Sequence, residues 1–275
     1  MNRNQKILKY ITKEMVGIEV APYHNPLAAK SDGFNSIVLD IYTKDELCER
    51  ANSDNDFNLK NKINLIEEVD LVANALDIKI ASSEKYPTTP IEYVLSSHNF
   101  EHLPDPISFM RSTADTLIEG GILSMAIPNK KDTFDCARRL SSTADLLKAY
   151  VYKYKKPNPF DVFDFSSQFI NTATSPYSYS NDISICYEKL LKDLDQEKLL
   201  PYEDVHVWVF TLESFLAIVN DLLILKLIPL DLIDFESNGF EFYVHFKNIG
   251  YDAVSERRIN YLQNRINLAN IAFKN

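Results

Sequence analysis

The sequence has no closely spaced pair of cysteines. Its three cysteines, Cys48, Cys136 and Cys186, lie far apart, and their number is odd. Without a CxxC pair, neither a disulfide framework nor a cysteine-ligated zinc site is expected. This use of cysteine is typical of a reducing compartment, so we expect a cytoplasmic protein.

Long hydrophobic runs and an excess of positive charge are also missing. The most apolar window, FLAIVNDLLILKLIPLDLI, is interrupted by Asp221, Lys226 and Asp231, so no membrane span is expected. The N-terminal stretch MNRNQKILKYITKE has no apolar run long enough for a signal peptide. A formal net charge of −10 argues against binding to a nucleic-acid backbone, so we expect no nucleic-acid partner.

What the chain does have is a hydrophobic content of 45% over 275 residues, enough for one large domain or a domain with an elaborated second part. Apolar stretches of strand length alternate with helical stretches in the first half. Strands are predicted over 17–21, 35–41, 66–73, 91–97 and 122–128, and helices over 3–14, 43–51 and 105–121. This alternation predicts an α/β fold with a mostly parallel sheet covered by helices on both faces.

Three regions follow from the pattern. Residues 1–150 form the predicted nucleotide-binding core, 151–205 an insertion that serves as a lid or binds an acceptor, and 206–275 the remainder of the core. The insertion is rich in aromatic residues and should be helical near 182–200. After it we expect a strand at 205–210, a helix, a last strand at 240–247 and a C-terminal helix. That last helix either caps the domain or, as the second alternative, forms a homodimer.

The turn after the first strand, in VGIEVAPYHNPL, contains no glycine. Ligands of parallel α/β sheets bind beyond the carboxyl ends of the strands, where glycines usually allow close approach of the backbone. Ala21 is expected to be tolerated there with a negative φ, and Asn25 to adopt the left-handed conformation. Asp40, at the end of the second strand, is placed to accept two hydrogen bonds from a ribose diol, or else caps the next helix.

The segment IEYVLSSHNFEHLPDP places His98 directly after the fourth strand, where it could act as a general base. HNFEH matches the zinc-protease pattern H-x-x-E-H, but that pattern requires a helix, and this segment leaves a strand and soon meets prolines. A divalent ion held by His98, Glu101 and His102 with His206 is a weaker alternative. A hydrogen-bonded pair that pins the loop is the favoured interpretation, so no metal is predicted.

One basic stretch follows the fifth strand and contains Lys130, Lys131, Arg138 and Arg139. We select Lys131 and Arg138 as candidate residues for binding an anionic acceptor. The alternative is a solvated helix face.

Together these segments resemble the class I S-adenosylmethionine-dependent methyltransferases, in particular the type 11 group. The resemblance is carried by GIEVAP, IVLD and YVLSSHNFEHLPDPISFMRSTADTLIEGGILSMAIP. HNP, FD…R and HVWVFTLESF resemble a bacterial subgroup associated with surface-polysaccharide biosynthesis. The family normally has acid-x-Gly-x-Gly-x-Gly at the first turn, and this chain keeps only the acid, Glu19. The resemblance implies a Rossmann-like fold of seven strands and S-adenosylmethionine as cofactor.

The resemblance also implies roles for individual residues. Glu19 would contact the amino end of the methionine part, with Ala21 and His24 beside it. Asp40 would hold the ribose hydroxyls and Asp70 would approach the adenine. Ser97 and His98 would lie nearest the reactive methyl group.

The expected activity is O-methylation of a sugar in a bacterial surface polysaccharide or its precursor, with His98 as the base and His206 in reserve. One alternative is a non-catalytic scaffold that has kept the fold, motivated by the missing glycines. Another is a methyltransferase acting on a small metabolite or a phosphate-type acceptor.

Overall fold

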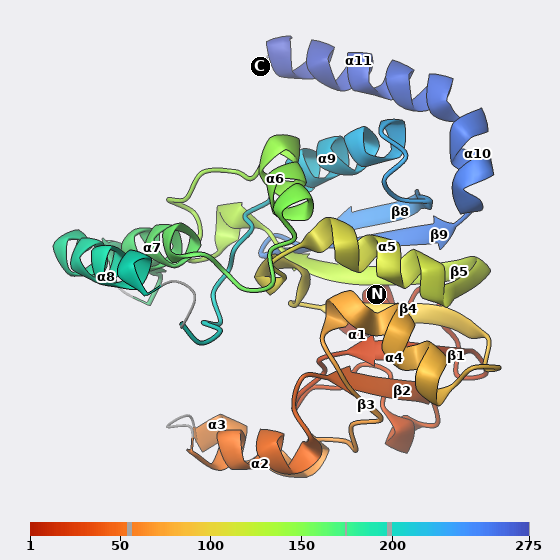
Figure 1. Ribbon diagram of the computed structural model, residues 1–275, viewed down its shortest axis with the longest axis horizontal. Coiled ribbons are helices and arrows are strands. Elements are labelled where there is room, and N and C mark those ends of the chain that lie inside the picture. Colours follow the sequence, from red (N-terminus) through yellow and green to blue (C-terminus); the bar gives the residue numbers. More distant parts are fainter. Residues whose placement is uncertain (54–56, 174, 197–199, 275) are drawn as a thin grey trace.

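A seven-stranded sheet forms the centre of the molecule (Figure 1). The computed structural model describes residues 1–53, 57–173, 175–196 and 200–274. The strand order is β3-β2-β1-β4-β5-β9-β8. The bounds of these strands are β1 Val16–Val20, β2 Asn35–Asp40, β3 Leu71–Val72, β4 Ile91–Ser97, β5 Leu117–Pro128, β8 Leu230–Ser237 and β9 Glu241–Asn248.

Five of these strands run parallel. β1 pairs in parallel with both β2 and β4, β2 with β3, and β4 with β5. β9 is antiparallel to β5 and to β8. The predicted mostly parallel seven-stranded sheet is therefore confirmed, and the carboxyl ends of the parallel strands meet at one edge.

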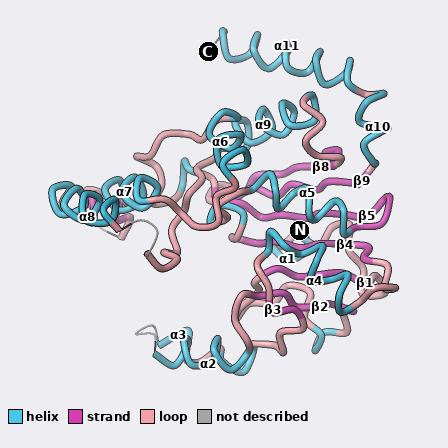
Figure 2. Tube along the Cα trace, viewed as in Figure 1, coloured by secondary structure: helices cyan, strands magenta, loops and turns pink. Residues whose placement is uncertain are grey.

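Helices cover the sheet unequally, as the tube view in Figure 2 shows. Their bounds are α1 Arg3–Ile7, α2 Lys44–Ser53, α3 Phe57–Lys60, α4 Ile78–Lys85, α5 Pro106–Thr116, α6 Thr143–Tyr152, α7 Pro159–Gln168, α8 Ile183–Asp195, α9 Leu212–Ile224, α10 Gly250–Glu256 and α11 Arg258–Lys274. One face, with Ile18 and Val94, packs against α5 and α9 in the main core. The opposite face, with Tyr93 and Tyr243, packs against Ile7 of α1 in a smaller core.

The connection from β1 to β2 contains no α-helix. Residues 21–34 form an irregular loop with one short 3-10 helix, Lys30–Asp32. Leu27 and Ala28 of this loop are buried in the smaller core beside Tyr93 and Leu95. The loop therefore takes the place that a crossover helix holds in most parallel units.

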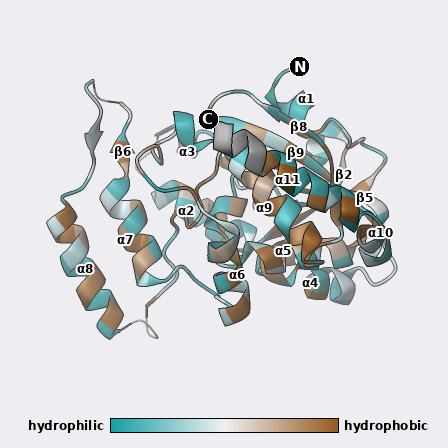
Figure 3. Ribbon diagram, turned by 90° about the horizontal axis from the view of Figure 1, so that it is seen from above, coloured by the Kyte–Doolittle hydropathy of each residue, from teal (hydrophilic) through white to brown (hydrophobic). Residues whose placement is uncertain are grey.

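The region between α6 and residue 205 contains α7, α8 and a two-stranded ribbon of β6 Ile170–Asn171 and β7 Ser178–Tyr179. α7 packs against α8, and both lie to one side of the main sheet (Figures 1 and 3). The helix predicted within 182–200 is present as α8. The domain boundaries at 150 and 205 stay a prediction.

Some predicted boundaries are wrong. The helix expected over 105–121 ends at Thr116, because Leu117 already pairs with Ile91 and the double glycine lies inside β5. The helix expected over 3–14 ends at Ile7. Residues 205–210 form a buried irregular segment instead of a strand, and the edge strand β8 was not predicted.

The C-terminal helix α11 packs against α9. Ile259 and Ile266, two members of its apolar stripe, are exposed. These two residues therefore do not bury α11 against α9, whereas Arg265 of α11 forms an ion pair with Asp221 of α9. In the part of the chain that is described, no helix combines the length and apolar character needed to cross a membrane.

Candidate functional site

The glycine-free turn after β1 keeps a backbone that glycine would favour. Ala21 and Tyr23 both have a φ of 48°, in the left-handed region. The expected negative φ of Ala21 is therefore wrong, and Asn25 is not among the left-handed residues. L-residues adopt this conformation at an energetic cost of about 1–2 kcal/mol each, so the surrounding structure must hold it. Packing does so: Ala21 lies against the main core, and Tyr23 packs in a small cluster with Leu47.

Glu19 fixes the far side of this loop. Its side chain is buried on β1, and its two carboxylate oxygens accept hydrogen bonds from the backbone N–H groups of Leu27 and Ala28, at 2.7 and 3.0 Å. His24, the other turn residue predicted to be near the cofactor, has its ring edge-on to Tyr23. Glu19 thus holds the backbone at Leu27 and Ala28, at the end of this turn.

Burial raises the pKa of Glu19 from 4.5 to about 7, although the two backbone hydrogen bonds lower it. The folded state therefore holds a proton that the unfolded chain loses near its ordinary pKa, and stability should fall as the pH rises from 4.5 through 7. Between about pH 5 and about pH 8 we expect wild type to lose up to about 3 kcal/mol more than Glu19→Gln, measured by urea unfolding. Equal losses in both proteins would contradict this expectation.

Asp40 ends β2 as predicted, with 5% of its surface exposed. One carboxylate oxygen accepts the backbone N–H of Tyr42 at 3.1 Å. Burial raises the pKa of Asp40, while the backbone hydrogen bonds of Tyr42 and Ile41 and the charge of Arg50 lower it. The carboxylate has more acceptor sites than this bond uses, as a diol ligand would require.

Asp70, which the resemblance places near the adenine, lies just before β3 and not inside a strand over 66–73, because β3 begins at Leu71. Its carboxylate accepts the backbone N–H of Val38 at 2.7 Å and pairs with Lys30, which holds β2 and β3 in register. Asn74, which was not predicted as a site residue, follows the carboxyl end of β3 at Val72. The intervening Ala73 donates its backbone N–H to the carbonyl of Asp40 and so stays beside the end of β2. Asn74 was missed because β3 is only two residues long.

At the carboxyl end of β4, Ser97 and His98 join a network built from distant parts of the chain. Arg3 of α1 donates to Ser97 Oγ at 2.8 Å and forms a double ion pair with Glu241 of β9. His98 Nε2 lies 2.8 Å from Glu241 Oε2. His98 has a φ of 50° and a side chain that is 36% exposed, so its ring is accessible and its backbone is strained.

The state of Glu241 determines which nitrogen of His98 is available. Burial raises the pKa of Glu241, but the hydrogen bonds from His98, Arg3 and Tyr243 outweigh it and lower that pKa to about 2. An ionised carboxylate accepts only, so Nε2 of His98 donates to it. In neutral His98 the lone pair is then on Nδ1, which lies 3.7 Å from Glu101 Oε1.

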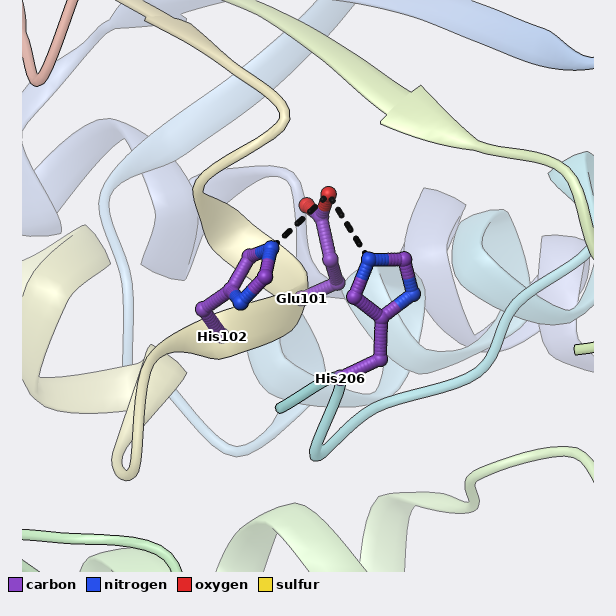
Figure 4. A group of neighbouring side chains, drawn as sticks. All are labelled: Glu101, His102 and His206. Carbon is purple, nitrogen blue, oxygen red and sulfur yellow. Dashed lines mark ion pairs between the residues drawn. The ribbon is translucent and has the colours of Figure 1, made fainter. Parts of the chain in front are cut away.

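Glu101, His102 and His206 lie together next to His98 (Figure 4). Glu101 and His102 belong to the short 3-10 helix Phe100–His102, whereas His206 comes from the irregular segment before α9. The backbone N–H groups of Val207 and Trp208 both donate to the Glu101 carbonyl, at 2.8 and 3.1 Å, which brings that segment to the short helix. His206, the predicted reserve base, is 8% exposed.

The two predicted acceptor residues are placed very differently. Lys131 is exposed and lies 3.9 Å from Glu213. Arg138 is buried, and its guanidinium pairs with Asp135 and Asp164 at 2.8 Å each. Arg138 also lies over the ring of Phe165. The guanidinium of Arg138 is therefore engaged within the protein.

A cavity of about 440 Å³ lies where α6 and α7 meet the segment that carries Trp208. Its lining includes Arg139, Asp145, Lys148 and Asp161. Glu19 and Asp40 are not part of this lining, so the cavity belongs to the side of the insertion and not to the β1 turn.

Known proteins resemble this chain in structure but not in sequence. No protein-family model matches the sequence, and no curated protein matches it. Solved structures similar in fold include an O-methyltransferase family protein from Burkholderia thailandensis, with 11% identity and a TM-score of 0.40, covering 85% of this chain and 51% of that chain. The N-methyltransferase NodS from Bradyrhizobium japonicum WM9, in complex with S-adenosyl-L-homocysteine, has 8% identity, a TM-score of 0.37 and coverages of 90% and 83%. A SAM-dependent methyltransferase from Methanosarcina mazei has 12% identity, a TM-score of 0.41 and coverages of 88% and 96%.

The strand order, with β9 inserted antiparallel between β5 and β8, is that of an α/β, Rossmann-like fold, as the resemblance of the sequence to class I methyltransferases implies. With TM-scores below 0.5, these similarities carry no conclusion about this chain, and an activity has to be inferred from the residues at the carboxyl edge of the sheet.

Proposed function

We propose that the protein is an S-adenosylmethionine-dependent methyltransferase that methylates a hydroxyl group of a sugar, in a bacterial surface polysaccharide or its precursor. The observation that carries this proposal is the pair of His98 and Glu241 at the carboxyl end of β4, beside a β1 turn in the left-handed conformation. The sugar as acceptor is supported by aromatic side chains on the same side of the molecule. Phe134 stacks on Phe169 with ring centroids 4.5 Å apart, and His206 lies against Phe134.

The residues at the sheet edge fit the cofactor in two respects. The left-handed turn at Ala21 and Tyr23 has the backbone conformation that glycines otherwise provide at this position. The Asp40 carboxylate would accept hydrogen bonds from the ribose hydroxyls, and Asn74 would lie beside the adenine. Glu19 would act through the turn that it holds, because both of its oxygens already accept backbone N–H groups. When bound, the cofactor supplies an electrophilic methyl group.

The chain's own residues align the acceptor and remove its proton. A sugar hydroxyl is a weak nucleophile at neutral pH, so a base is needed. His98 would take the proton at Nδ1 while Nε2–H stays hydrogen-bonded to Glu241, which stabilises the imidazolium that forms. Arg3 would hold Glu241 in place from the other side.

Titration with S-adenosylhomocysteine by calorimetry tests the cofactor site. We expect micromolar binding, weakened about 10- to 100-fold in Asp40→Ala, because hydrogen bonds to a charged carboxylate contribute about 1.5–3 kcal/mol. The matched control is Asp45→Ala, an exposed aspartate at the start of α2, which should bind as wild type does. A folded protein that does not bind would favour the scaffold alternative.

A further inference from the structure

The buried carboxylate of Glu101 lies among imidazole rings. The residue is 1% exposed, and neither of its side-chain oxygens has a hydrogen-bond partner among the described residues. An ionised carboxylate without partners is strongly disfavoured in a protein interior. Three imidazoles face it: His98 Nδ1 and His102 Nε2 are each 3.7 Å, and His206 Nε2 is 3.8 Å, from Glu101 Oε1. Figure 4 shows His102 and His206 of these three.

These separations are too long for hydrogen bonds, whose N···O distances are about 2.7–3.2 Å. They are close to the spacing of two ligands on one metal ion. Ligands about 2.1 Å from a tetrahedral ion lie about 3.4 Å from each other. The ligand atoms of Glu101, His102 and His206 all lie within 4.8 Å of one another. The two separations between Glu101 and the imidazoles of His102 and His206 therefore match an ion better than a direct contact.

Carboxylates lie beside the outer nitrogens of both imidazoles. His206 Nδ1 is hydrogen-bonded to Asp135 Oδ2 at 2.6 Å. His102 Nδ1 lies 2.8 Å from Asp204 Oδ1 as an ion pair, without the geometry of a hydrogen bond. Metal-binding histidines usually have such a partner, because it fixes the tautomer and directs the other nitrogen's lone pair to the ion. Here both lone pairs would be directed from Nε2 toward Glu101.

With neutral imidazoles, the negative charges around the cluster outnumber the positive ones. Glu101, Asp135 and Asp204 bring three carboxylates to two imidazoles, and Arg138 offers one guanidinium, which it shares between Asp135 and Asp164. A divalent cation at the centre would supply the missing positive charge. The competing arrangement has two protonated imidazoles, but their N–H groups would then be expected at hydrogen-bond distance from Glu101.

We propose that Glu101, His102 and His206 form a binding site for a divalent transition-metal ion. Two imidazoles and one carboxylate are a ligand set of Zn²⁺ sites and of non-haem iron sites, and three protein ligands leave coordination positions open. Asp135 and Asp204 orient the two imidazoles. Arg138 would not contact the ion but donates a hydrogen bond to Asp135 and so holds that carboxylate in place.

The open positions have a use in the proposed methyl transfer, and this step of the inference rests on the proposed function. His98 Nδ1 is 3.7 Å from the same Glu101 oxygen, so an acceptor hydroxyl bound to the ion would lie beside the base. A bound ion makes such a hydroxyl more acidic. The O–H proton would pass to His98, the oxygen would form a bond with the methyl carbon, and the bond from that carbon to sulfur would break. The substrate class would then be a sugar whose hydroxyl coordinates the ion.

Metal uptake by the full-length protein tests the site without any assay of activity. The protein is first stripped with a chelator, and Zn²⁺ or Mn²⁺ is then titrated by calorimetry, with the bound metal counted by elemental analysis after gel filtration. We expect one ion per chain. Glu101→Gln, which keeps the shape of the side chain, and His206→Ala should each weaken binding at least about 100-fold, whereas Asp204→Asn should weaken it about 10- to 100-fold. Glu213→Gln, at an exposed carboxylate, is the control and should bind as wild type does.

A stripped, folded protein that takes up no ion would overturn the proposal, as would equal binding by wild type and Glu101→Gln. Circular dichroism of each variant establishes that it is folded. If a substitution at His206 unfolds the chain, Glu101→Gln still decides the question. S-adenosylhomocysteine is titrated separately in the presence of chelator, so that failure of the cofactor site and failure of the metal site give different results.

Discussion

Replacing His98 with alanine is expected to lower methyl-transfer turnover by about 10²- to 10⁴-fold, the usual contribution of a general base. The affinity for S-adenosylhomocysteine should change by less than about threefold, because the base acts on the acceptor and not on the cofactor. Turnover is measured with labelled cofactor on a sugar acceptor, and affinity by calorimetry on the same preparation. The split between the two quantities separates loss of a base from loss of the fold.

His245→Ala is the matched control. His245 lies on β9 with its ring nitrogen 2.8 Å from Ser124 Oγ, is buried within the sheet and takes no part in the network of Glu241. Turnover per folded molecule should stay near that of wild type. Unchanged turnover in His98→Ala would remove His98 from the mechanism, and Glu101 and His206 would then be tested as the groups that activate the acceptor.

Replacing Arg138 with alanine should have the largest effect on stability. The substitution would remove the guanidinium from Asp135, which is 2% exposed and would keep only the imidazole of His206 as a partner. Removing one member of a buried ion pair typically costs about 3–5 kcal/mol. Chemical denaturation of the purified variant measures this loss. Arg139→Ala is the natural control, because the neighbouring Arg139 is exposed and pairs with Asp145 at the surface, where such a pair contributes below about 1 kcal/mol.

The double variant Arg138→Ala, Asp135→Asn should recover part of the lost stability, since it also removes the uncompensated charge. Similar losses in Arg138→Ala and Arg139→Ala would show that the buried pair has no special weight. An anion-binding role of Arg138, as the basic stretch of the sequence suggested, would require this pair to open.

The fold could be predicted from the sequence because its signals are local. The apolar residues Tyr93, Val94 and Leu95 of β4 are contiguous. Thr43 and Glu46, three residues apart, form a capping box in which the Thr43 N–H donates to Glu46 at 2.8 Å. The exact ends of elements could not be predicted. Leu117 belongs to a strand and not to the preceding helix because it pairs with Ile91. β3 has only two residues, so the sequence pattern did not show that Asp70 precedes it.

The candidate site could be predicted only where it lies within one stretch of sequence. His98 and Asp40 are identified by their positions at the ends of strands. Their partners are not, because Glu241 is 143 residues from His98 and nothing in either segment indicates the pairing. The conformation of the β1 turn is a further example. Ala21 and Tyr23 do not favour a positive φ, and it is packing from elsewhere in the chain that holds them there.

The position of Trp208 gives the protein an optical reporter of its own. Trp208 is the single tryptophan of the chain, and its indole N–H donates to the carbonyl of Leu103 at 2.6 Å, directly after the helix that carries Glu101 and His102. Emission excited at the red edge of absorption, where tyrosine does not contribute, therefore comes from one place. Its wavelength and its quenching would follow events at that short helix in the unlabelled, full-length molecule.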